Sequence, residues 1–168
     1  LSRIINAGQS CIAAKRTIVE APVYDRMVEL LQDRLAKLKV GDPREESTDV
    51  GPIARDDLRA NLHRQVRATV DAGATCRLGG ELPRGDGFFY PVTLLTDVTQ
   101  DMTGACEETF GPVAVVMKAA DADEALAIAN DTPYGLAAAV WTDAARGEAM
   151  ARRLYTGQVS VNGIVKTD

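Results

Sequence analysis

The apolar residues of this chain recur with two different spacings. Over residues 23–38 and 58–70 they return every three or four positions, which is the spacing of an amphipathic helix. Pro22 suits the first turn of the earlier helix, and Gly73 ends the later one. The pattern therefore predicts two long helices in the first half of the chain, joined by a loop over residues 40–52.

Strand-like stretches lie around these helices. A continuous apolar run at residues 113–117 is typical of a strand buried on both faces, and Asp121 with Glu124 resembles a cap that opens a helix ending near residue 129. Further elements are predicted as strands at residues 15–20, 90–95, 137–142 and 158–162, and as a helix at residues 144–155. Alternating strands and helices favour a layered α/β domain with a largely parallel sheet, formed by residues 1–168 as one domain.

Composition and charge narrow the function. The net charge of the 168-residue chain is -5 and its basic residues are scattered, so we expect no nucleic-acid partner. No apolar run reaches the roughly 20 residues that a membrane span needs, so we expect no membrane association. The three cysteines (Cys11, Cys76 and Cys106) have no metal-ligand spacing, and the chain has one histidine. We therefore expect a cytoplasmic protein without a disulfide framework or a metal site.

One cysteine follows a glycine-containing turn, Asn6-Ala7-Gly8-Gln9-Ser10-Cys11. Gly8 allows a sharp bend, and a helix opening at this turn would lower the thiol pKa and offer N–H groups to an oxyanion. The alternative is a buried cysteine that packs as a small apolar residue. His63 lies within a helical pattern and is expected at the surface, which disfavours a cysteine–histidine hydrolase. From these residues alone, a nucleophile and a structural thiol are equally supported.

Four motifs together resemble the aldehyde dehydrogenase superfamily. The turn ending at Cys11 is similar to its catalytic cysteine motif, and residues 107–113 (EETFGPV) are similar to its second signature. Residues 130–136 (NDTPYGL) resemble the turn that follows, and the loop with residues 41–43 (GDP) and 49–52 (DVGP) resembles a loop of these enzymes. The resemblance covers essentially the whole chain and implies the cysteine-bearing catalytic domain.

The resemblance implies roles for three residues. Cys11 would attack the aldehyde carbon to form a thiohemiacetal and later a thioester, with NAD or NADP as cofactor. Glu108 matches the residue that binds the ribose next to the nicotinamide, and Phe110 matches the aromatic residue near the nicotinamide. Without the motif, Glu107 and Glu108 would be interpreted as a solvated acidic pair, and Phe110 as a core aromatic residue.

The two ends of the chain are most similar to the bacterial succinate-semialdehyde dehydrogenase branch. This similarity makes Ser10 and Thr167 candidate hydroxyl donors to the distal carboxylate of that substrate. Thr167 stands where serine is usual, and Ile5 stands where some animal-type enzymes carry arginine. The plainer interpretation is that Ser10 is a turn residue and Thr167 a loop hydroxyl. The implied partners are a small-molecule aldehyde and, in the full-length protein, further copies of the same chain.

The family's general-base glutamate and its cofactor-binding domain precede the cysteine, and a further segment follows the last strand. We therefore expect residues 1–168 to be a partial catalytic domain that is inactive alone. Two other classes stay open. One is a non-catalytic structural or binding domain of the same fold, and the other is a thiol acyl carrier or redox protein.

Overall fold

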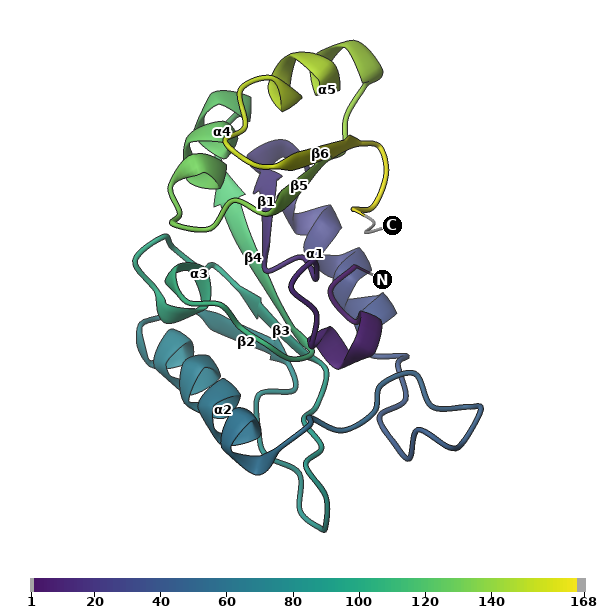
Figure 1. Ribbon diagram of the computed structural model, residues 1–168. Helices are drawn as coiled ribbons and strands as arrows, with labels where there is room; N and C mark the ends of the chain where they lie inside the picture. Colours follow the sequence, from purple (N-terminus) through teal and green to yellow (C-terminus); the bar gives the residue numbers. More distant parts are fainter. Residues whose placement is uncertain (1, 166–168) are drawn as a thin grey trace.

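The computed structural model describes residues 2–165. Thr167, a predicted substrate contact, lies outside the described residues. A short 3-10 helix, η1, precedes the first strand; two successive helices and two successive strands follow it, and from α3 onward helices and strands alternate (Figure 1). The elements are η1 (Ile5–Gly8), β1 (Arg16–Glu20), α1 (Ala21–Leu35), α2 (Asp56–Asp71), β2 (Thr75–Leu78), β3 (Thr93–Thr96), α3 (Thr103–Cys106), β4 (Val113–Ala119), α4 (Ala122–Asn130), β5 (Ala137–Val140), α5 (Ala144–Ala151) and β6 (Gln158–Val161).

The strands form two sheets. The main sheet has the order β1-β4-β3-β2, in which β4 pairs in parallel with β1 and β3 while β2 is an antiparallel edge strand. The second sheet is the parallel pair β5-β6. The predicted α/β architecture with a largely parallel sheet is confirmed. The periodicity did not indicate that the last two strands would form a sheet of their own.

β4 is the centre of the core because both of its faces are covered. Val113, Val115 and Met117 pack in a cluster with Leu62 of α2, whereas the intervening residues of β4 pack in a second cluster with α1. The two long helices therefore cover opposite faces of the main sheet, as Figure 1 shows. The continuous apolar run in the sequence has this cause, since alternate side chains of a strand point to opposite faces.

Most predicted elements are present, with shorter ends. The cap at Asp121 is confirmed, since its carboxylate accepts hydrogen bonds from the N–H groups of Asp123 and Glu124. The predicted helix 144–155 ends at Ala151, and the predicted strand 90–95 begins at Thr93. Four of the described helices, α1, α2, α4 and α5, were predicted from the sequence, whereas the four-residue helix α3 was not. No helix among the described residues has the length and apolar character needed to cross a membrane.

Candidate active site

The turn that carries Cys11 has an unusual backbone. Asn6, Ala7 and Gly8 all have positive φ angles, of 53°, 52° and 72°. Two local hydrogen bonds close the turn, because the Gln9 N–H donates to the Asn6 carbonyl at 2.9 Å and the Asn6 amide donates to the Gln9 carbonyl at 3.1 Å. Left-handed backbone at non-glycine residues is costly, so the surrounding structure must hold this turn in place.

Cys11 lies exposed beyond this turn, with a free thiol. The hypothesis that the turn opens a helix at Cys11 is wrong. The helical residues Ile5–Gly8 precede the cysteine, and the next element is β1. The reason is that Arg16 and the residues after it pair with β4, which draws the chain into the main sheet. Within residues 2–165, no helix begins at Cys11.

The cysteine turn packs directly on the loop of residues 107–112. A Cβ atom built on Gly8 would overlap the carbonyl oxygen of Gly111, so the two backbones touch. Gly111 is tightly enclosed as well, because a Cβ there would overlap the side chain of Leu62. Two motifs that lie about a hundred residues apart in the sequence therefore meet through a pair of glycines, and a side chain at Gly8 would have to displace the backbone of Gly111.

Arg3 fastens these two segments together. Its side chain is buried and donates to backbone carbonyls on both sides, at 3.0 Å to Gly8, at 2.9 Å to Thr109, and also to Gly111. A fourth bond runs from Nη1 to the carbonyl of Ala14 at 3.2 Å. Burial lowers the pKa of Arg3 to about 10, and the charge of Glu108 acts in the opposite direction. The buried guanidinium is thus satisfied by carbonyl oxygens instead of a carboxylate.

Gln9 ties the turn to a third motif. Its side-chain nitrogen donates to the carbonyl of Pro52 at 3.2 Å, and its side-chain oxygen accepts from the N–H of Ala54 at 2.8 Å. Residues 49–52 are the loop pattern recognised in the sequence, so the loop supports the cysteine turn from a third side. Sequence reasoning singled out neither Arg3 nor Gln9 for these contacts.

Glu108 and Phe110 meet the cysteine turn at Lys15. The Lys15 ammonium lies 3.4 Å from Oε1 of Glu108 and 5.1 Å from the centroid of the Phe110 ring. It also donates to the carbonyl of Ser10 at 2.8 Å. The predicted cofactor residues and the backbone of the cysteine turn are therefore gathered around one lysine that was not predicted as a site residue. The only sequence signal was its place four residues after Cys11.

The acidic pair is divided between two partners. Glu107 accepts hydrogen bonds from Gln65 at 2.9 Å and from Arg64 at 2.8 Å, and these two contacts lower the pKa of Glu107, with Gln65 the larger cause. The Gln65 amide also donates to the backbone carbonyl of Glu108 at 3.1 Å. Glu107 thus faces α2 while Glu108 faces Lys15. Phe110 is half-buried at the site and lies outside both core clusters.

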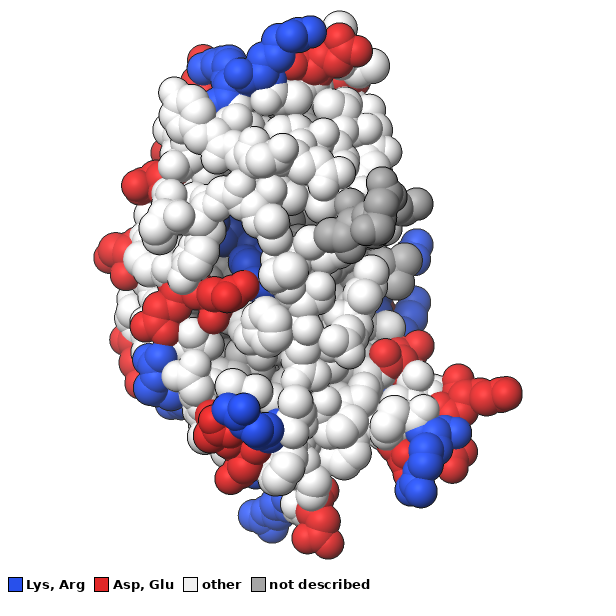
Figure 2. Space-filling model, in the orientation of Figure 1, with Lys and Arg blue, Asp and Glu red and all other residues white. Residues whose placement is uncertain are grey.

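Figure 2 shows the charged side chains on one face of the molecule. A hollow in the middle of the visible face has Lys or Arg atoms at its floor and Asp or Glu atoms at its rim, while most of the surrounding surface is uncharged. Ser10 lines a separate small pocket together with Ile5, Ile12 and Ile164. The side chains that line it are apolar apart from two serines, Ser2 and Ser10.

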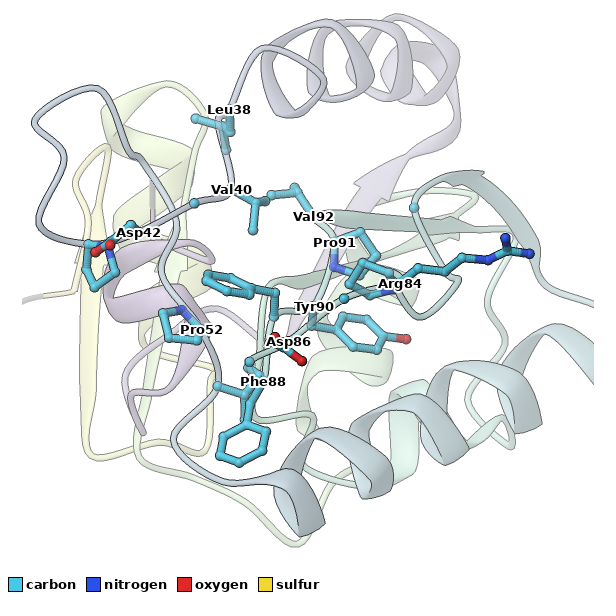
Figure 3. A pocket seen from close by; sticks show the side chains of 18 of the residues that line it. Leu38, Val40, Asp42, Pro52, Arg84, Asp86, Phe88, Tyr90, Pro91 and Val92 are labelled. Carbon is cyan, nitrogen blue, oxygen red and sulfur yellow. The ribbon is translucent and has the colours of Figure 1, made fainter.

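A larger pocket of about 1080 Å³ lies between the loop of residues 40–54 and the loop of residues 79–92. Figure 3 shows Val40, Pro52 and Phe88 around it. Its lining is mainly apolar and includes none of the predicted site residues, although Pro52 and Ala54 also contact Gln9. This pocket is therefore adjacent to the support of the cysteine turn and distinct from the Lys15 cluster.

The other two cysteines have different surroundings from Cys11. The Cys106 thiol donates to the carbonyl of Gln100 at 2.8 Å, and the Cys76 thiol donates to the carbonyl of Leu78 at 3.4 Å. Burial raises the pKa of Cys76. His63, predicted at the surface, is half-buried, with Nδ1 3.2 Å from the hydroxyl of Tyr90. No cluster of three or more potential metal ligands occurs within residues 2–165.

The carboxylate of Glu108, a hydrogen-bond acceptor, suits the sugar next to the nicotinamide of a nicotinamide cofactor. The Glu108 side chain keeps 41% of its surface exposed, and a carboxylate accepts hydrogen bonds from a diol. The half-buried Phe110 ring offers an apolar face next to it. These two residues would hold the ribose and the nicotinamide.

Comparisons with known proteins agree with these motifs. The model of the aldehyde dehydrogenase family matches residues 1–168. A succinate-semialdehyde dehydrogenase [NADP(+)] of Mycobacterium avium is 48% identical over 164 residues, which are 97% of this chain and 35% of the relative. An aldehyde dehydrogenase of Paenarthrobacter nicotinovorans is 44% identical over 165 residues, which are 98% of this chain and 36% of the relative.

Solved structures show the same fold. A succinic semialdehyde dehydrogenase from Streptococcus pyogenes in complex with NADP+ superposes with a TM-score of 0.95 at 33% identity, over 99% of this chain and 37% of that structure. A Mycobacterium tuberculosis aldehyde dehydrogenase complexed with NAD+ gives a TM-score of 0.94 at 33% identity, over 98% of this chain and 35% of that structure. The chain spans about a third of the length of the curated relatives it matches. It belongs to the aldehyde dehydrogenase family.

Proposed function

We propose that this chain carries the nucleophile and the nicotinamide-side contacts of a site that oxidises a small aldehyde to a carboxylic acid. The observation that carries the proposal is the contact between the Cys11 turn and the Glu108 loop, through Gly8, Gly111 and Arg3. That contact joins the segment that carries the exposed Cys11 thiol to the segment that carries Glu108, which supports a shared site. A structural role for either residue would not require the two to be joined.

In the proposed reaction the Cys11 thiolate attacks the aldehyde carbon, forming a carbon–sulfur bond and an alkoxide. The Cys11 backbone N–H would donate a hydrogen bond to this oxyanion. When bound, NAD or NADP supplies the hydride acceptor that converts the thiohemiacetal into a thioester. Water then cleaves the thioester, releasing the acid and restoring the thiolate. Covalent capture holds the substrate still between steps.

Succinate semialdehyde is the substrate we infer, on the names of the relatives. We infer that the hydroxyl of Ser10 donates a hydrogen bond to the distal carboxylate of this substrate. We propose the same role for Thr167, which lies outside the described residues. The apolar side chains around Ser10 make a longer aliphatic aldehyde the competing substrate. Which of the two aldehydes is preferred can be decided by letting them compete for reaction with Cys11.

We infer that the 168 residues alone do not complete the reaction, because the matched relatives are nearly three times longer. For the whole protein we propose a cytoplasmic homo-oligomer. The non-catalytic alternative requires a Cys11 thiol no more reactive than the other two. A thiol acyl carrier or redox role requires a reactive Cys11 that works without Glu108.

Limited alkylation tests the nucleophile. The chain is treated with less than one equivalent of iodoacetamide, and the labelled peptides are quantified by mass spectrometry. We expect Cys11 to be labelled ahead of Cys76 and Cys106, because only the latter two donate their thiols to carbonyls within the described residues. Equal labelling of the three cysteines would contradict the proposal and favour the structural alternative.

A further inference from the structure

The Lys15 ammonium contacts both predicted cofactor residues and the backbone of the turn that carries Cys11. It donates to the carbonyl of Ser10 at 2.8 Å, lies 3.4 Å from Oε1 of Glu108, and faces the Phe110 ring at 5.1 Å from its centroid. These groups come from two segments that are far apart in the chain. The Lys15 side chain is only 19% exposed, so its charge is held at this place by its partners.

Lys15 is the cation that forms an ion pair with the Glu108 carboxylate. Arg3 is also close, but its guanidinium is occupied by the carbonyl oxygens of Gly8, Thr109, Gly111 and Ala14. The loop that carries Glu108 has no regular secondary structure between α3 and β4. A carboxylate on such a loop loses side-chain freedom when it binds a ligand, and a cation that already holds one of its oxygens reduces that cost.

The charged groups that face Lys15 act in opposite directions. Burial lowers the pKa of Lys15 and the charge of Arg3 lowers it further, while Glu108 and an ionised Cys11 raise it. The pKa of Lys15 therefore depends on the charges of both Glu108 and Cys11. The contact with Phe110 adds a cation–π attraction that fixes the ring relative to the same ammonium.

We propose that Lys15 is a positioning residue, whose ammonium holds the Glu108 carboxylate and the Phe110 ring in place against the turn that carries Cys11. This inference rests on the proposed function, in which Glu108 and Phe110 bind the cofactor. Lys15 touches no reacting atom in this account. It leaves the second carboxylate oxygen of Glu108 for a ribose hydroxyl.

The first test is a titration of Lys15 by carbon NMR in the 168-residue chain labelled with [ε-13C]lysine, with the Lys15 signal assigned by K15R. In E108Q we expect the pKa of Lys15 to fall, because the charge that raised it is gone. The other lysine signals serve as internal controls. A Lys15 titration that is the same in wild type and E108Q would overturn the proposal.

The second test measures hydrogen exchange of the backbone amides at residues 108–111. We expect exchange in K15M to be roughly two- to fivefold faster, the size of effect that a partly exposed ion pair has on local opening, and K15R to restore the slower rate. K118M is the matched control, because Lys118 also lies 5.1 Å from an aromatic centroid, that of Tyr24, but away from this loop. Equal exchange in K15M and K118M would overturn the proposal.

The two proposals fail separately. If Cys11 shows no preferential alkylation while E108Q still shifts the Lys15 titration, then Lys15 positions Glu108 as inferred and the proposed aldehyde chemistry is wrong. If Cys11 is alkylated first while Lys15 is insensitive to E108Q, the nucleophile stands and the role of Lys15 is wrong.

Discussion

The carbonyl oxygen of Gly111 occupies the space that a side chain on Gly8 would need. This contact joins the cysteine motif to the motif of Glu108 and Phe110. Gly8 also has a φ angle of 72°, which favours glycine on its own account. The site is therefore built on a backbone-to-backbone contact that no other residue at position 8 can make.

The substitution G8A is expected to destabilise the chain by about 3 kcal/mol or more, from the overlap together with the left-handed backbone. The matched control is G85A, because Gly85 also has a positive φ of 111° but nothing within 4 Å of a built Cβ. It is expected to cost only about 1 kcal/mol. Urea denaturation of the two variants checks this, and equal losses would show that the Gly8–Gly111 contact is unimportant.

Arg3 holds the same junction by hydrogen bonds, and R3M is expected to cost about 3 kcal/mol of folding free energy. The buried carbonyl oxygens of Gly8, Thr109 and Gly111 would each lose a donor. We also expect Cys11 to lose its preference in limited alkylation, since the turn is released. R26M is the control, because Arg26 is exposed and pairs only with Glu29. Unfolding midpoints that are equal for R3M and R26M would contradict this role.

Glu107 makes the stability of the fold depend on pH in the acid range. Hydrogen bonds from Gln65 and Arg64 lower the pKa of Glu107 in the folded chain. The folded state then binds fewer protons than the unfolded state, so this contribution is present above the unfolded pKa and is lost as pH falls through the folded one. The loss of stability between pH 7 and about pH 3 should be smaller in E107Q than in wild type.

Urea midpoints at a series of pH values check the acid dependence. E29Q is a suitable control, because the Glu29 side chain is 65% exposed and contacts only another exposed side chain, that of Arg26. A pH dependence that is unchanged in E107Q would mean that the contacts with Gln65 and Arg64 do not persist in solution.

Substitution of Glu108 should affect the alkylation of Cys11 far less than substitution of Cys11 itself. Because we assign Glu108 to the cofactor, E108Q is expected to change the rate of Cys11 alkylation by no more than about twofold, within the range of a screened surface charge. The rates are compared by quenched labelling and peptide mapping. A loss of Cys11 labelling in E108Q as large as that in C11S would mean that Glu108 serves the nucleophile directly.

Local patterns predicted the elements because the residues responsible lie close together in the chain. The apolar run of β4, the helix periodicity of α1 and α2, and the cap at Asp121 are all such signals. The family motifs singled out Cys11, Glu108 and Phe110, whose roles stay predictions. The hypothesis that the turn opens a helix at Cys11 was wrong, because the chain after Ala14 pairs as β1 with β4.

The contacts that assemble the site could not be predicted in the same way. Arg3 meets Gly111, Gln9 meets Pro52, and Lys15 meets Glu108, each across a long separation in sequence. A basic or amide residue beside a turn gives no indication of which distant carbonyl or carboxylate it will reach. α3 was missed for a related reason, since the Gly104 N–H is held by the hydroxyl of Thr69 in α2.

The central claim is that Cys11 is a nucleophile that forms a thioester, and acylation of the 168-residue chain by p-nitrophenyl acetate tests it without any cofactor. Attack by the thiolate expels p-nitrophenolate and leaves an acetyl group on sulfur, which peptide mapping locates. We expect one acetyl group on Cys11, formed with a burst of p-nitrophenolate that C11S abolishes and C76S and C106S retain. Acetylation spread over the three cysteines, or a burst that survives in C11S, would contradict it.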